Sequence, residues 1–576
     1  MRLAVLAAAL LAAPPAAAES RSEPADLVLR NGRIVTLDPA RPEVPALAVR
    51  GGRLVAVGGE AEIRAHVGEG TRVLDLGGRL AIPGFIESHA HFANLGRAAM
   101  ILKLGGTRSW EEVVATVAAA VERAQPGEWM LGRGWHQEKW SAPPSPQVAG
   151  FPLHAALSRV SPDNPVVLTH ASGHASFVNA RAMELAGIDA ATPDPAGGEI
   201  LRDACGEPTG LLNETAQGLV AAGLDRFRRN QDPAASEREA RRALELANAE
   251  ALSKGITTFH DAGASFADID RVAELAAAGK LGVRLWVMVR DTPAEMVAKL
   301  AAYRRVGAAG GKLTVRAIKS YVDGALGSRG AWLLAPYSDL PSTSGLAVSE
   351  LSELRAIAAL ALEHDYQFCV HAIGDRGNRE VLDLFRDALA TVPDGKARRW
   401  RIEHAQHLHP TDVPRFAELG VIAAMQGIHC TSDAPFVSPR LGEKRAREGA
   451  YVWRELVDSG ALVVNGTDAP VEDVDPIPSF YATVTRRLPD GTRFYAEHAL
   501  SRLEALRSYT LGAAYAAFEE GEKGSLVAGK LADVTVLSQD ILTVPEDEIL
   551  AARVDYTIVG GEVLYARDSE SDASQR

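Results

Sequence analysis

Cysteine is scarce in this chain of 576 residues, and its three cysteines, Cys205, Cys369 and Cys430, lie far apart in the sequence. This number and spacing exclude a disulfide framework and a zinc site made of cysteines. Cys369 falls in an apolar, strand-like segment, where a buried free thiol is common. Any bound metal ion must therefore be held by histidines and carboxylates.

An excess of positive charge is also missing. The chain has 61 Lys and Arg residues against 74 Asp and Glu residues, which gives a formal net charge of −13. Proteins that bind nucleic acid carry a basic surface, so this charge argues against that class. The composition, 47% hydrophobic and 23% charged, is that of a globular protein able to bury a large core.

Long hydrophobic runs are absent as well, since no segment reaches the roughly 20 apolar residues that span a membrane. The first residues nevertheless form a distinct segment, with Arg2, an apolar run over 3–13, and small residues up to Ala18 before Glu19. This order is typical of a cleavable secretory signal. We predict a signal peptide over residues 1–18 and export to the periplasm or the cell exterior. A membrane anchor is the alternative interpretation.

Short alternating segments separated by glycines occur near both ends of the mature chain. Asn31-Gly32, between two short apolar segments, is the strongest short hairpin signal, and Gly560-Gly561 separates two similar segments near the other end. We predict that residues 19–80 and 520–566 form the two parts of one small β-sandwich. The last residues, 567–576, are polar and charged and predict a disordered tail.

Between these ends, strand patterns alternate with helical patterns over several hundred residues. Such alternation predicts an α/β protein with a parallel sheet, and a closed (β/α)8 TIM-type barrel over residues 81–519 is the commonest way to bury one. The eight candidate strands are 82–88, 256–260, 283–289, 314–320, 367–371, 401–404, 421–425 and 462–467. Residues from about 110 to 238 are too many for a loop after the first strand and predict an inserted subdomain.

The sharpest chemical signal is His89-Ala90-His91, which follows the first predicted strand. Residues i and i+2 of a strand point to the same side, so both imidazoles can bind one cation. Two surface histidines at a strand end are the alternative, because one such spacing arises easily by chance among 15 histidines.

Other ionisable residues share this placement. His371, His404 and Asp468 each lie at the C-terminal end of a predicted strand, and Lys319 lies within one. In a (β/α)8 barrel these strand ends meet at one mouth, where active sites are built. Buried histidines without a shared partner would be costly, so we expect ligands rather than core residues. For Asp468, a turn residue is the alternative.

The sequence resembles the amidohydrolase superfamily, and in particular its amidohydrolase family 3 branch of N-substituted formamide deformylase-like, metal-dependent hydrolases. The resemblance covers essentially the whole mature chain and follows the family's order of motifs. It rests on PGFIESHAHF (83–92), GEPTGLLNETA (206–216), KSYVDGALGS (319–328), VHAIGDRGN (370–378), RIEHAQ (401–406), NGTDAPVEDVDP (465–476) and GSLVAGKLADVTVL (524–537).

The resemblance implies two divalent metal ions, for which zinc is the expected identity. Its motifs assign His89, His91 and Asp468 to one ion and His371 and His404 to the other. Asp468 would also contact the bridging water and serve as the catalytic acid and base.

Lys319 matches the position of a carbamylated lysine that bridges both ions in the superfamily. Two cations about 3.5–4 Å apart repel each other, and a bridging carboxylate offsets that repulsion. In the alternative interpretation Lys319 is a plain cation paired with a carboxylate such as Asp323, and one ion or none is bound.

Five further residues are candidates for contact with the substrate: Trp135, His174, Glu214, Arg329 and His429. His174 corresponds to a recurring histidine of the family branch. A structural role is an equal alternative for these residues, and Trp135 in particular would then pack the insertion.

The implied reaction is hydrolysis of a C–N bond in an amide, an N-acyl amine or an N-formyl amine, with Asp468 transferring the water's proton to the leaving nitrogen. A mononuclear deaminase of an aminated heterocycle and a secreted, non-catalytic binding protein are the alternatives. We expect a small-molecule substrate as the partner, without nucleic acid or a membrane span, and a homo-oligomer is compatible with the sequence. The Gly-x-Ser-x-Gly pattern of many serine hydrolases is absent.

Overall fold

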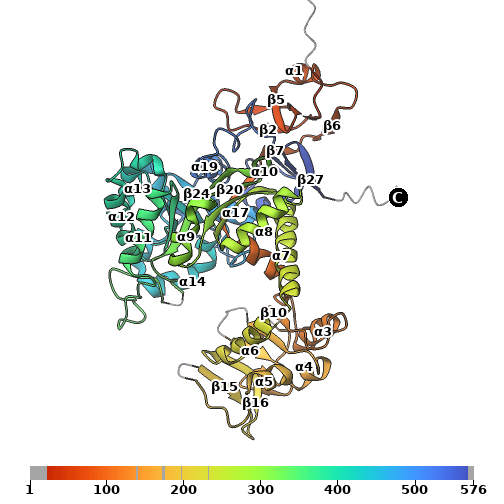
Figure 1. The fold of residues 1–576 in the computed structure, drawn as a ribbon, viewed down its shortest axis with the longest axis vertical. Coiled ribbons are helices and arrows are strands. Elements are labelled where there is room, and N and C mark those ends of the chain that lie inside the picture. The colour runs from red at the N-terminus through yellow and green to blue at the C-terminus, as the bar shows by residue number, and fades with distance from the viewer. Residues whose placement is uncertain are drawn as a thin grey trace, which may run out of the picture.

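The computed structural model describes residues 23–137, 140–170, 175–195, 198–230, 232–327 and 329–567. Figure 1 shows a barrel in the centre, a small all-β part at its upper end and a separate lobe at the opposite end. Within the described residues, no helix combines the length and the apolar character needed to cross a lipid bilayer.

Eight parallel strands form the central barrel, and their order around it follows the chain. They are β8 (Phe85–Ala90), β17 (Ile256–Ala264), β18 (Arg284–Val289), β20 (Leu313–Tyr321), β21 (Gln367–Ala372), β22 (Arg401–His404), β23 (Ile422–Gln426) and β24 (Val463–Gly466). Each strand overlaps one of the predicted strands. The predicted α/β class with a (β/α)8 barrel is therefore confirmed.

The predicted first strand, 82–88, is divided between two sheets. Leu80–Pro83 (β7) pairs with β25 (Val534–Leu537) of the all-β part, whereas β8 starts the barrel. Gly84 lies between them, at a place where an added Cβ would be 2.2 Å from Cγ2 of Thr257. The chain thus passes from one sheet to the other through a residue that must lack a side chain.

Strands β8 and β24 close the barrel at a junction that we call the barrel seam. The amide of Asp468 donates to the carbonyl of His89 across the seam at 2.7 Å. The carboxyl of Glu87 accepts hydrogen bonds from the amides of His89 (2.9 Å) and Thr467 (3.0 Å) and from the Thr467 hydroxyl (3.0 Å). A Cβ on Gly466 would be 2.3 Å from Oε1 of Glu87, so the strands meet where glycine allows a close approach.

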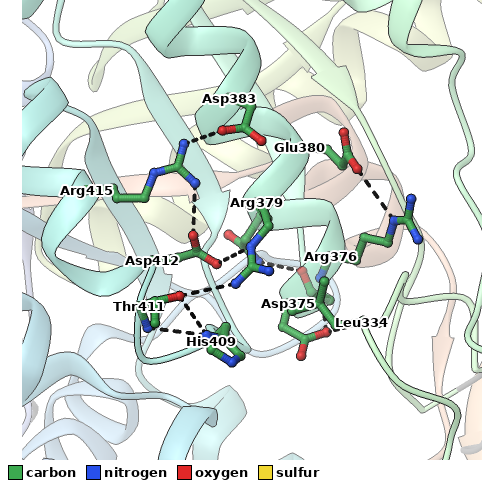
Figure 2. Close-up of polar contacts among 12 residues, drawn as sticks. Leu334, Asp375, Arg376, Arg379, Glu380, Asp383, His409, Thr411, Asp412 and Arg415 are labelled. Carbon is green, nitrogen blue, oxygen red and sulfur yellow. Dashed lines mark hydrogen bonds and ion pairs between the residues drawn. The ribbon is translucent and has the colours of Figure 1, made fainter.

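Helices cover the outside of the barrel, among them α8 (Phe266–Ala277), α9 (Pro293–Tyr303), α11 (Leu351–Glu363), α12 (Asp375–Leu389) and α13 (Val413–Leu419). The buried side of α12 carries apolar residues at helical spacing, including Val381, Leu384 and Phe385. Its outer side is charged: Figure 2 shows Arg415 of α13 bound to Asp383 and Asp412. The pair with Asp383 connects α13 to α12, two consecutive helices of the barrel's outer layer, whereas Asp412 is the N-cap residue of α13 itself.

The all-β part is a sandwich built from both ends of the chain. Its sheets have the orders β5-β4-β1-β6 and β27-β26-β25-β7-β2-β3, and residues of both sheets share one core that contains Leu29, Leu47 and Val536. The strands not yet defined are β1 (Leu27–Arg30), β2 (Arg33–Val35), β3 (Glu43–Val44), β4 (Ala46–Arg50), β5 (Arg53–Gly58), β6 (Arg72–Asp75), β26 (Val554–Val559) and β27 (Glu562–Ala566). This is the predicted sandwich.

The hairpin predicted at Asn31-Gly32 is wrong. Strand β1 pairs with β4 and β6, whereas β2 pairs with β3 and β7, so the two flanking strands belong to different sheets. The Asn31 side chain instead donates to Asp75 at 2.7 Å. The signal at Gly560-Gly561 is correct, because β26 and β27 pair directly.

The lobe is inserted between β8 and β17 and contains a six-stranded sheet of order β15-β16-β14-β13-β10-β9. Its elements include β9 (Leu102–Lys103), α3 (Trp110–Val121), β10 (Met130–Trp135), β13 (Val166–His170), β14 (Ala175–Val178), α5 (Ala180–Ala186), β15 (Gly198–Arg202), β16 (Pro208–Glu214) and α6 (Gln217–Asn230). Helices α2 (Phe92–Ala99) and α7 (Pro233–Ser253) join it to the barrel, and Figure 1 shows α7 running from one to the other. Because the lobe follows the C-terminal end of β8, it extends from the mouth side of the barrel.

Candidate metal centre

Five of the six predicted ligands form one cluster at the barrel mouth. The ring centroids of His371 and His404 are 4.5 Å apart, those of His404 and His89 4.8 Å, and those of His89 and His91 5.9 Å. Oδ1 of Asp468 lies 3.1 Å from Nε2 of His91 and 3.6 Å from Nε2 of His89. We call these four histidines and Asp468 the imidazole cluster.

The ends of the barrel strands position the cluster. His404 is the last residue of β22, and Asp468 follows β24 by two residues. Both have left-handed backbones, with φ of 74° and 57°. Such a backbone costs a non-glycine residue about 1–3 kcal/mol and is concentrated at functional sites. Asp468 is also a turn residue, since its carbonyl accepts from the amide of Val471 at 2.9 Å, but its side chain is directed to the histidines.

Burial and neighbouring charges favour neutral imidazoles beside an ionised carboxylate. Burial and the charge of Lys319 lower the pKa of His89 to about 4 and that of His371 to about 3. Burial, His371 and His89 hold the pKa of His404 well below its ordinary value. Burial would raise the pKa of Asp468, but the imidazole of His91, which lies 3.1 Å from Oδ1, and the other imidazoles lower it.

The donor atoms of the cluster fit a divalent cation. Nε2 of His89, Nε2 of His371 and Oδ1 of Asp468 are buried and have no hydrogen-bond partner among the described residues. A buried polar atom without a partner costs about 1–3 kcal/mol, which a ligand would remove. Neutral imidazole nitrogens and a carboxylate oxygen are donors that zinc uses. His89, His91 and Asp468 offer three such atoms within 4.8 Å of one another.

Lys319, the sixth predicted ligand, is buried on β20 beside the cluster. Its Nζ lies 4.6 Å from the ring centroid of Tyr321, and that ring lies 5.0 Å from the ring of His371. In the described part of the chain no carboxylate is within 4 Å of Nζ. Asp323 instead accepts backbone hydrogen bonds, including those from Ile373 (2.9 Å) and Gly374 (2.8 Å). The alternative pairing of Lys319 with Asp323 is therefore not found.

Sequence reasoning missed three polar residues that hold the histidines. Glu403 accepts a hydrogen bond from Nδ1 of His89, and Arg401 donates to both oxygens of Glu403, at 2.7 and 2.9 Å. Oε1 of Gln426 lies 2.6 Å from Nδ1 of His404. The sequence signal that could have found two of them is that Arg401 and Glu403 flank Ile402 and precede His404 on the same strand. A strand buried on both faces does not show from its sequence which side chains face the barrel interior.

Among the predicted substrate contacts, His429 lies against the cluster. Its ring is stacked on that of His404 at 6.3 Å, and its buried Nε2 makes no hydrogen bond with any described residue. Trp135 is instead fully buried in the core of the lobe, stacked on Trp140, with Nε1 donating to the carbonyl of Leu168 at 2.8 Å. The prediction for Trp135 is contradicted, because its large apolar surface packs the insertion.

Of the other three candidates, only the side chain of Arg329 is among the described residues. Arg329 binds Asp339 through Nη2 at 2.8 Å. His174 lies outside the described residues, and so does the side chain of Glu214, whose backbone belongs to β16. Their predicted contacts with the substrate stay predictions.

Comparison with known sequences decides the family. The sequence pattern described as Amidohydrolase family matches residues 72–565, which include the barrel, the lobe and about half of the sandwich. The chain belongs to the amidohydrolase family. The resemblance seen in the sequence motifs is thereby confirmed.

This amidohydrolase matches several relatives over nearly their whole lengths. It is 33% identical over 560 residues to Protein LONG AFTER FAR-RED 3 of Arabidopsis thaliana, covering 94% of this chain and 92% of that protein. It is 28% identical over 561 residues to N-substituted formamide deformylase of Arthrobacter pascens, covering 94% and 98%. Among solved structures, an uncharacterized metal-dependent hydrolase from Pyrococcus horikoshii OT3 superimposes with a TM-score of 0.71 at 26% identity, covering 90% of this amidohydrolase and 99% of that chain.

Proposed function

We propose that this protein is a metal-dependent hydrolase that cleaves a C–N bond in an amide, an N-acyl amine or an N-formyl amine. The observation that carries the proposal is the imidazole cluster, where buried Nε2 atoms and Oδ1 of Asp468 converge without partners. Membership of the amidohydrolase family and similarity to a formamide deformylase support the reaction class.

Divalent cations bound at such a cluster acidify a water molecule and polarise a substrate carbonyl. The chain's own residues would supply proton transfer and positioning. Asp468 is ionised and buried, and its carboxylate is placed to receive the proton of the attacking water and to pass it to the leaving nitrogen. His429, stacked beside His404, presents a buried Nε2 that would hydrogen-bond a substrate oxygen.

We further propose that two ions bind, with zinc as the expected metal. His89, His91 and Asp468 would hold one ion, and His371 and His404 the other. The ammonium of Lys319 beside these residues would repel both ions, whereas a carbamate on Nζ would replace its positive charge with a bridging carboxylate.

Metal content tests this arrangement. We expect about two ions per chain in the wild type, and one or none in Lys319→Ala, because a binuclear site needs the bridging group. His364→Asn is the matched control, since it removes a partly exposed imidazole at the end of α11 and should keep both ions. A wild type that holds about one ion per chain and keeps it without loss in Lys319→Ala would favour the mononuclear deaminase.

Turnover tests the reaction class. We expect metal-replete protein to hydrolyse members of a panel of N-formyl, N-acetyl and N-acyl amino acid substrates. Asp468→Asn should lower the rate by about 10²–10⁴-fold, the range of general acid–base catalysis. Unchanged activity in Asp468→Asn would exclude its proton transfer, and inactivity of the wild type on the whole panel would support a binding protein.

We also propose that the chain is exported after removal of residues 1–18. The basic, apolar and small-residue order of this segment supports the proposal. Mass spectrometry of the protein from the producing cell should find Glu19 at the N-terminus outside the cytoplasm. A cytoplasmic chain that retains its leader would contradict it.

A further inference from the structure

His89 is held by a series of hydrogen bonds that is buried throughout. Its Nδ1 bonds Glu403, and Nη2 of Arg401 donates both to Glu403 at 2.9 Å and to the carbonyl of Ser88 at 2.8 Å. Nη1 of Arg401 lies 3.3 Å from Nδ1 of His260. The side chains of His89, Glu403, Arg401 and His260 are all fully buried, so no water competes for these contacts.

The direction of these hydrogen bonds follows from Arg401. A guanidinium group only donates, so Arg401 uses both oxygens of Glu403 as acceptors. The proton between Glu403 and His89 therefore belongs to Nδ1 of His89. In the neutral imidazole, Nε2 is then the unprotonated nitrogen, and it is the nitrogen that lies 3.6 Å from Oδ1 of Asp468.

We propose that Glu403, fixed by Arg401, is a positioning residue that locks His89 in its Nε2-ligating tautomer and raises the affinity of the cluster for the cation that His89 and His91 share. This inference rests on the proposed metal site. A carboxylate that accepts from Nδ1 also makes Nε2 more basic and so a better ligand. His404 differs, because its Nδ1 faces the neutral amide of Gln426.

A purely structural ion pair in the barrel interior is the alternative role for Glu403. The chain offers a matched pair to separate the two roles, formed by Arg284 and Asp533. Their side chains are 5% and 4% exposed and share two hydrogen bonds, at 2.8 and 3.0 Å. Arg284 is the first residue of β18, so this pair lies at the end of the barrel opposite the mouth. Breaking it removes a buried ion pair without touching an imidazole.

The test compares Glu403→Gln with Asp533→Asn. Zn²⁺ affinity is measured on metal-stripped protein by competition with a chelator of known affinity, and thermal unfolding of the stripped proteins reports stability. We expect both variants to unfold at a lower temperature than the wild type. Glu403→Gln should bind Zn²⁺ about 10–100-fold more weakly, the range for loss of a residue that orients a metal ligand, whereas Asp533→Asn should bind as the wild type does.

Glu403→Asp is a second variant, which keeps the charge beside Arg401 but draws it back from His89. It should retain most of the stability and still lose Zn²⁺ affinity. Wild-type affinity in Glu403→Gln, or an equal loss in Asp533→Asn, would overturn the proposal. A wild type that binds no Zn²⁺ would instead refute the proposed metal site itself.

Discussion

Two neighbouring imidazoles of the cluster are oriented by side chains of different charge. His89 bonds the carboxylate of Glu403, and His404 bonds Oε1 of Gln426. The amide of Gln426 is itself fixed, because its Nε2 donates to the carbonyl of Ala424 at 3.0 Å. Charge-assisted hydrogen bonds are roughly twice as strong as neutral ones, so the two histidines depend on their partners to different degrees.

Replacement of Gln426 should therefore have a moderate effect on metal binding. In Gln426→Leu, His404 loses a neutral hydrogen bond worth about 0.5–1.5 kcal/mol, and we expect Zn²⁺ affinity to fall by about tenfold or less. Chelator competition on metal-stripped protein measures it, with His364→Asn as the control. A loss larger than that in Glu403→Gln would contradict the ranking by charge.

Residue types at strand ends were sufficient to predict where His89, His91, His371, His404 and Asp468 meet. The sequence does not show that Glu403 holds one of these ligands, because its strand is buried on both faces, and the alternation of Arg401 and Glu403 with Ile402 does not reveal which side faces the barrel interior. The predicted substrate contact of Trp135 failed for a related reason. The sequence does not distinguish a tryptophan at the barrel mouth from one in the core of the inserted lobe, because that difference depends on how the lobe packs.

Among the structural elements, β8 and β24 depend on Glu87, whose carboxyl joins them at the barrel seam. Burial raises the pKa of Glu87 to about 8, although hydrogen bonds from His89 and Thr467 oppose the shift. Near neutral pH the group is therefore largely uncharged. An uncharged carboxyl and a glutamine amide have nearly the same shape and both offer an acceptor oxygen.

Glu87→Gln should consequently be tolerated, while Glu87→Ala should not. We expect a loss of about 1 kcal/mol or less for glutamine, and of about 2–5 kcal/mol for alanine, which leaves a cavity and unpaired amides. Urea unfolding of metal-free protein at pH 7 measures both. Equal losses in the two variants would show that the charge of Glu87, rather than its shape, holds the seam.

Helices α2 and α7, which connect the lobe to the barrel, pack against each other with their backbones in close contact at Gly96 of α2 and Ala243 of α7. An added Cβ would lie 1.7 Å from the carbonyl oxygen of Ala243, so Gly96→Ala should force the helices apart and destabilise the protein by about 1–3 kcal/mol. Gly218→Ala in α6 is the control, because nothing lies within 4 Å of its added Cβ. The control should be neutral or stabilising by up to about 1 kcal/mol, since alanine favours helix. Thermal unfolding of both variants gives the comparison.

The positions of strands were more predictable than their pairing. All eight barrel strands follow from apolar segments of the right length, and the parallel order follows from the alternation with helices. The pairing of β1 with β4 and β6 rather than with β2 does not follow from Asn31-Gly32. A turn signal acts over four residues, whereas the sheet that a strand joins is decided by which core buries it.

At the scale of the whole molecule, the sandwich and the barrel are connected through buried hydrogen bonds from the C-terminal strands. The hydroxyl of Thr535 donates to the carbonyl of Gly255 at 2.6 Å, and that of Thr557 to the carbonyl of Leu252 at 2.7 Å. Arg284 of the barrel and Asp533 of the sandwich add the buried ion pair described above. The C-terminal strands therefore support both parts.

Truncation after Leu531 removes β25, β26 and β27, and we expect it to destabilise the rest of the protein as well. It would expose the sandwich core around Ile34 and Leu47, and we expect poor solubility and no cooperative thermal transition, because a large apolar surface would face water. A chain that ends at Arg567 retains β25, β26 and β27 and is the control. Circular dichroism melting and binding of a hydrophobic dye measure the difference. A cooperative transition in the shorter chain would contradict the shared stabilisation.

The division of the sandwich between the two ends of the chain sets a limit on when folding can finish. Strands β2 and β7 are among the first to leave the ribosome, yet β25, the strand that pairs with β7, is synthesised about 450 residues later. At roughly 5–20 residues per second, the earliest strands wait tens of seconds for their partner. Strand β7 of a nascent chain therefore stays without this partner until β25 has been synthesised, and the N-terminal strands need protection from aggregation during that interval.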